Sequence, residues 1–157
     1  MYPVAPWSSG ANPSVLPTTA TGPRTEAPDL AAAVHSLEEV VNHPDSDPLW
    51  LDRVLHRLSV VEEGFAAHVH ETEGKDGVYA DAARHDGRLV NRAQRLCREH
   101  VALESRIASL KALVRSPDVH PTAVRRPIHA LVTELRKHRQ RGAHLVFEAY
   151  RDLGGDG

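Results

Sequence analysis

The sequence predicts an all-α protein, an antiparallel up-down bundle of four helices near residues 29–42, 48–82, 87–115 and 123–152. Three observations predict this class. Apolar residues recur three and four positions apart over long stretches, which is the spacing of helices that bury one face. No stretch shows the convincing apolar-polar alternation of a half-buried strand. Short polar connections separate the helical stretches, as an antiparallel bundle requires.

The composition narrows the function classes. The 157 residues, 41% of them apolar, suit one domain with a single core. Nineteen Lys and Arg stand against 21 Asp and Glu, so the chain lacks the basic excess that nucleic acid binding needs. No apolar run is long enough to span a membrane. With one cysteine, Cys97, and no secretion signal visible in MYPVAPWSSG, we expect a cytoplasmic protein without an intrachain disulfide.

The first 27 residues differ from the rest of the chain. They are rich in Pro, Ser and Thr and poor in periodic apolar residues, so we expect residues 1–27 to be a disordered tail and residues 28–157 to form the bundle. Asp29 is a suitable N-cap for the first helix. The apolar residues of that helix repeat at Leu30, Ala33, Leu37 and Val40, and the segment HPDSDP ends it.

The second helix is expected to begin at Pro48, because proline is favoured in the first turn and Asp47 can cap the free N–H groups. Gly74 and Gly77 then disturb the pattern, at a cost of about 1 kcal/mol each inside a helix. We expect the helix to continue across both glycines to about residue 82, with a kink. That length places Tyr79 on the apolar face.

The last two helices have the clearest patterns. Their apolar positions are occupied by Leu89, Ala93, Leu96, Leu103, Ile107, Leu110 and Val114 in the third helix, and by Ile128, Leu131, Leu135, Leu145 and Ala149 in the fourth. The segment Arg-Ser-Pro-Asp at residues 115–118 ends the third helix, and two glycines at 154 and 155 end the fourth.

Each of the three long helices carries one histidine where its pattern calls for a core residue: His68, His100 and His138. A rise of about 1.5 Å per residue places the three at similar heights if the second helix is continuous. One such histidine is usually a core residue with a hydrogen bond. Three that meet could bind a transition metal, with Glu104 and Glu73 as the nearest carboxylates able to assist.

Three segments are similar to one known family. HVHETEGKDGVYADAA resembles the second-helix signature of hemerythrin-like (HHE cation-binding) domains, and LCREHVALESRIASL resembles their third-helix pattern. HRQRGAHLVFEAYRDLGG resembles the end of the fourth helix in a subgroup from high-GC bacteria. The similarity covers roughly residues 50–155. It implies a non-haem iron or di-iron centre that binds or senses O2 or handles iron. We therefore expect a metal-binding module that is not an enzyme in the ordinary sense.

The ligand set departs from the family pattern. Thr72 stands four residues after His68 where the family has Glu, and Gly142 and Ala143 stand where a carboxylate would follow His138. Bridging carboxylates normally hold a di-iron pair. The sequence therefore leaves open one iron, two irons or no metal. Without metal, the bundle would be an interaction or regulatory module whose protein partner the sequence does not identify. A di-iron oxidase or peroxidase is a third alternative, which would need more carboxylates.

Overall fold

The computed structural model describes residues 26–43 and 46–151. Within these ranges the elements are α1 (Leu30–Asn42), α2 (Trp50–Glu73), α3 (Val78–His85), the 3-10 helix η1 (Gly87–Leu89), α4 (Val90–Val114) and α5 (Pro121–Arg151). These ranges contain no strand, which confirms the all-α class. None of the described helices combines the length and the apolar character needed to cross a lipid bilayer. The predicted tail lies outside the described residues, apart from Glu26 and Ala27.

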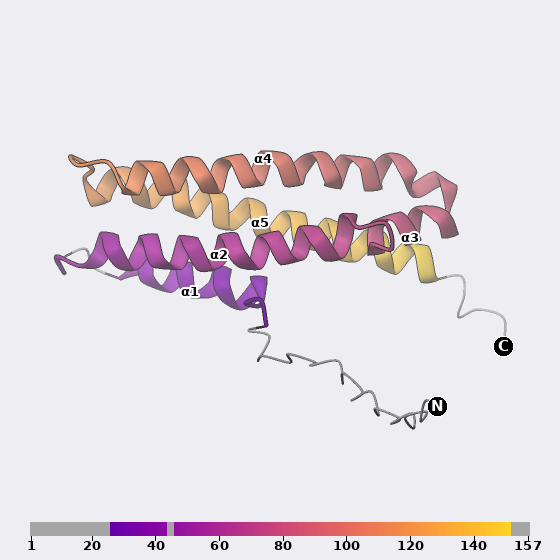
Figure 1. Ribbon diagram of the computed structural model, residues 1–157, viewed down its shortest axis with the longest axis horizontal. Coiled ribbons are helices and arrows are strands. Elements are labelled where there is room, and N and C mark those ends of the chain that lie inside the picture. The colour runs from indigo at the N-terminus through magenta and orange to yellow at the C-terminus, as the bar shows by residue number, and fades with distance from the viewer. Residues whose placement is uncertain (1–25, 44–45, 152–157) are drawn as a thin grey trace, which may run out of the picture.

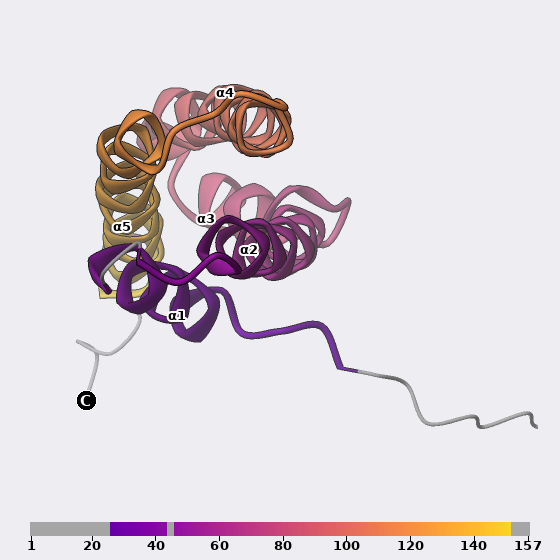
Figure 2. The same cartoon turned by 90° about the vertical axis from the view of Figure 1, so that its left-hand side faces the viewer.

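The helices pack side by side along one long axis. α2, α4 and α5 run most of the length of the molecule, α1 lies beside one half, and α3 lies at the opposite end (Figure 1). α1 and α4 each pack against both α2 and α5, so these four helices surround a common core in the end-on view (Figure 2). Because α1 has 13 residues and α5 has 31, the four-helix section covers only part of the length.

The ends of the helices follow the predicted signals closely. Asp29 is the N-cap of α1, and its carboxylate accepts a hydrogen bond from the Ala32 N–H at 2.8 Å. The Asp47 carboxylate accepts from the Leu49 N–H at 2.9 Å, one residue before α2 begins. The 3-10 turn η1 occupies the first three residues of the predicted third helix, so α4 begins only at Val90. The fourth predicted helix begins at Pro121, two residues before the predicted start.

The predicted single helix over residues 48–82 is wrong, because the chain breaks into α2 and α3 between Glu73 and Val78. The Gly77 N–H donates to the Gly74 carbonyl at 2.6 Å and closes a tight turn. A Cβ at Gly77 would overlap the backbone of Thr72 and Gly74, so the turn requires glycine. α3 nevertheless extends beyond the end of α2 and buries Tyr79, as the sequence predicted (Figure 1).

The described core has two apolar clusters. The larger fills the four-helix section, and the smaller joins α3, η1, α4 and α5 at the other end through Tyr79, Ala82, Leu89, Ala93, Leu96, Leu145 and Ala149. His100 lies in α4 between Leu96 of the smaller cluster and Leu103 of the larger one. His138 has the same place in α5. A layer of imidazoles therefore separates the two clusters.

Candidate metal centre

Three helices bring His68, His100 and His138 together. His68 comes from α2, His100 from α4 and His138 from α5. The ring centroids are 5.3 Å apart for His68 and His100, 5.4 Å for His68 and His138, and 4.6 Å for His100 and His138. One ring nitrogen from each lies within 4.8 Å of the others. The histidines therefore meet in space, as the pattern of the three helices predicted.

Two of the three imidazole rings have a carboxylate bound at Nδ1. Nδ1 of His100 is 2.6 Å from Glu73 Oε1, and Nδ1 of His138 is 2.9 Å from Glu99 Oε2. An ionised carboxylate only accepts hydrogen bonds, so both rings carry their proton on Nδ1 when they are neutral. The Nε2 atom of each ring is left with a lone pair. This carboxylate–histidine arrangement is the usual support for histidines that bind metals.

The Nε2 atoms differ in what they contact. His68 Nε2 lies 3.3 Å from His138 Nε2. Since His138 carries its proton on Nδ1, His68 donates this hydrogen bond from Nε2. His100 Nε2 is buried and has no partner among the described residues. A buried nitrogen without a partner costs about 1–3 kcal/mol, so the cluster is incomplete as a set of hydrogen bonds.

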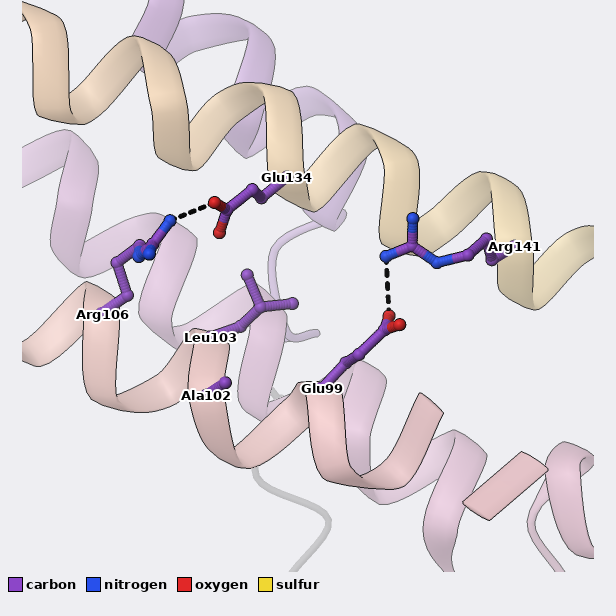
Figure 3. Close-up of a pocket in the computed structure, with 6 residues that line it drawn as sticks. All are labelled: Glu99, Ala102, Leu103, Arg106, Glu134 and Arg141. Atoms are coloured by element: carbon purple, nitrogen blue, oxygen red, sulfur yellow. Dashed lines mark hydrogen bonds and ion pairs between the residues drawn. The ribbon is translucent and has the colours of Figure 1, made fainter. Parts of the chain in front are cut away.

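Glu99 is fixed by a second contact, with Arg141 of α5. The guanidinium donates to Glu99 Oε2 at 2.8 Å (Figure 3). Figure 3 also shows Arg106 and Glu134 paired across the same two helices, on the far side of a pocket of about 190 Å³. Burial opposes ionisation of Glu99, but the hydrogen bonds from Arg141 and His138 hold its pKa below the ordinary value. Glu99 is therefore a carboxylate at neutral pH.

The protein environment lowers the pKa values of His68 and His138. Burial, and then the nearby His138, His100 and Arg139, lower the pKa of His68 from 6.5 to about 4. Burial also lowers the pKa of His138, although the Glu99 hydrogen bond acts in the opposite direction. Metal ions bind the neutral form of imidazole, and a lowered pKa keeps both rings in that form near pH 7.

Two aromatic rings enclose the histidines. Phe65 lies on the side of the larger cluster, with ring centroids 5.9 Å from His68, 5.6 Å from His100 and 6.2 Å from His138. Tyr79 stacks on His100 at 5.8 Å with 17° between the rings. These contacts exclude water from two sides and fix the ring orientations.

His68 provides the access from solvent. His100 and His138 are 1% and 0% exposed, whereas His68 is half-buried. His68 lines a groove of about 510 Å³ that also includes Gly64, Glu71 and Arg139. α1 begins beside Gly64, where a Cβ would lie 2.8 Å from the Pro28 carbonyl oxygen, and the residues that lead into α1 line the groove together with His68.

The predicted carboxylates have different positions. Glu73 reaches the cluster, where it binds Nδ1 of His100. Glu104 is exposed on α4, and no contact joins it to the histidines. Glu99 contacts His138 but was not among the predicted site residues. Its signal in the sequence is its place next to His100, within the Glu-His pair of the third-helix segment.

The sequence matches no protein-family model, no curated protein and no solved structure. Membership of the hemerythrin-like family therefore stays a prediction.

Proposed function

We propose that this chain is a metal-binding module that holds one transition-metal ion through Nε2 of His68, His100 and His138. The observation that carries the proposal is the convergence of the three imidazoles, two of which have Nδ1 held by a carboxylate. Imidazole nitrogen suits zinc, copper, iron and nickel. The metal would supply an open coordination position in a site enclosed by Phe65 and Tyr79.

One of the three nitrogen pairs already has the spacing that such an ion requires. Nitrogen ligands at about 2.0–2.1 Å from a tetrahedral ion are roughly 3.3 Å apart. His68 Nε2 and His138 Nε2 are already at 3.3 Å. A metal would replace the proton between them, and His68 would then carry its proton on Nδ1. It would also provide the partner that buried His100 Nε2 lacks. The widest separation of the ligand atoms, 4.8 Å, requires a closer approach by about 1.5 Å.

One ion is favoured over two. A pair of irons is normally bridged by carboxylates. The carboxylates that reach the cluster, Glu73 and Glu99, contact Nδ1 atoms on the outer side of the rings. Glu104, the other predicted carboxylate, is exposed. The same shortage of carboxylates disfavours a di-iron oxidase or peroxidase.

Iron, with a role in O2 binding, O2 sensing or iron handling, is the proposed physiological metal because of the similarity to hemerythrin-like domains. The antiparallel up-down order of α1, α2, α4 and α5 belongs to the same proposal. It is supported by the packing of α1 and α4 against both α2 and α5. A reducing, cytoplasmic setting is supported by the lone free thiol of Cys97, and the near balance of charge favours no nucleic acid partner.

The second candidate is a metal-free interaction or regulatory module. The direct hydrogen bond between His68 and His138 favours it, because this contact lets the two rings satisfy each other without an ion. Both have lowered pKa values and tolerate burial as neutral side chains. In this candidate the histidines specify the packing of α2 and α5.

Metal content measured by elemental analysis separates the two candidates. The protein is purified anaerobically with iron supplied, and the His68→Ala, His100→Ala and His138→Ala variants are treated identically. His70→Ala is the matched control, since His70 is exposed on the same helix as His68. We expect one ion per chain in the parent and control proteins and a loss of metal in each of the three variants. Stoichiometric absence of metal from the parent protein would leave the second candidate.

A further inference from the structure

Two buried polar atoms lack partners at the same place in the molecule. Among the described residues, the buried side-chain nitrogen and oxygen atoms without a hydrogen bond are His100 Nε2 and the Tyr79 hydroxyl. They belong to one stacked pair of rings. Buried polar groups in proteins almost always have a partner, which is often a ligand or a water. Two exceptions side by side therefore indicate a missing group.

The hydroxyl of Tyr79 lies against α5, one turn after His138. It occupies the place that a side chain at Gly142 would fill, since a Cβ there would overlap the hydroxyl oxygen. The Tyr79 ring stacks on His100, and His100 in turn lies 4.6 Å from His138. α3 and Gly142 thus place a hydrogen-bond donor on a ring that stacks on His100, one turn along α5 from His138.

The proposed metal accounts for His100 Nε2 but not for the hydroxyl. We propose that Tyr79 donates a hydrogen bond to a water or hydroxide that completes the coordination of the ion held by the three histidines. This inference rests on the proposed function. Three protein ligands and one water are the usual set of an open metal site. The Tyr79 hydroxyl is buried without a hydrogen-bond partner, on a ring that stacks on His100, so its proton is available for such a bond.

Co(II) is the probe, because its visible absorption reports a change in the bound water. The absorption is titrated between pH 5 and pH 10 in the parent protein, in Tyr79→Phe and in Tyr150→Phe. The control, Tyr150, lies in the same end of the molecule, but its hydroxyl binds Asp81 instead of facing the histidines. A metal-bound water ionises near pH 7 in open sites.

We expect Tyr79→Phe to raise the pKa of the bound water by about one unit, because a hydrogen bond to a charged group is lost. Tyr150→Phe is expected to leave the titration unchanged. Both variants should still take up one Co(II) per chain, because the three histidine ligands are unchanged. The metal-free Tyr79→Phe protein should unfold at the same temperature as the parent or a higher one, since the variant removes a hydroxyl without a partner.

Three results would overturn the inference while leaving the proposed function intact. The first is an unchanged titration in Co(II)-bound Tyr79→Phe. The second is metal-free Tyr79→Phe that is unstable or unfolded, which would show that the hydroxyl has a partner without metal. The third is an intense phenolate-to-metal absorption in the Fe(III)-loaded parent that Tyr79→Phe lacks, which would make Tyr79 a ligand itself. Absence of Co(II) binding to the parent would instead refute the proposed function.

Discussion

At the scale of single residues, Glu99 joins the cluster to the surface. Its carboxylate accepts hydrogen bonds from both His138 and Arg141. Arg141 therefore holds the Glu99 carboxylate in place, and the carboxylate keeps the proton of His138 on Nδ1. Replacing Glu99 by Gln removes the charge of the side chain, keeps its shape and so tests this contact.

We predict that Glu99→Gln weakens metal binding about 10- to 100-fold, the range typical of losing a carboxylate behind a histidine ligand. Competition against a metal-binding dye measures the affinity. Glu148→Gln is the control, since Glu148 pairs with Arg92 across the same two helices, away from the histidines. Equal affinities for the Glu99 and Glu148 variants would show that Glu99 has no part in the site.

Gly142 gives a second prediction. Gly142→Ala should destabilise the protein by about 1–3 kcal/mol, because the new methyl group overlaps the Tyr79 hydroxyl. The double variant Gly142→Ala with Tyr79→Phe should recover part of that loss, since the oxygen is the atom in closest contact. Urea unfolding measures both. A double variant no more stable than Gly142→Ala would place the clash elsewhere in the backbone.

The sequence revealed the three histidines because each replaces an apolar residue on a buried face. It did not reveal Glu99. Successive helical residues point about 100° apart, so Glu99 and Glu104 lie on either side of His100 around α4. Which of the two faces the neighbouring helix depends on where α5 lies across α4. That placement follows from the packing of the whole bundle, which the pattern of one helix does not contain.

At the scale of elements, the break between α2 and α3 determines which side chains reach the histidines. We predict that Gly77→Ala destabilises the protein, because its Cβ would overlap backbone atoms of Thr72 and Gly74. Gly87→Ala should change the thermal unfolding temperature little, since a Cβ at Gly87 would have no neighbour within 4 Å. If the two variants unfold at the same temperature, the turn does not depend on glycine.

The same break explains why the predicted continuity of the second helix is wrong. The heights of the histidines require a continuous helix only if a chain that ends its helix at Gly74 turns back at once. α3 instead extends past the end of α2 before the chain turns (Figure 1). The heights therefore agree without continuity, because a tight turn with little change of level could not be distinguished from a kinked helix by counting residues.

At the scale of the whole molecule, acid should weaken the metal-free fold. The pKa of His68 is about 4 in the folded protein against an ordinary 6.5, so below pH 6.5 the unfolded chain binds a proton that the folded chain does not. Stability is therefore lost as the pH falls from about 6.5 to about 4, and His138 acts in the same direction. Thermal unfolding in the presence of a chelator measures this loss, and His68→Gln should flatten it. A melting temperature that does not change across this window would contradict the prediction.

The layer of histidines between the two apolar clusters also divides the molecule into two candidate cooperative units. Without metal, amide hydrogens of α3 and the adjoining ends of α4 and α5 should exchange with solvent at a lower opening free energy than those of the four-helix section. An ion bound to α2, α4 and α5 together would tie both units to one opening event. Exchange protection would then become uniform along α5, because the bound ion would couple two halves of the molecule that otherwise open separately.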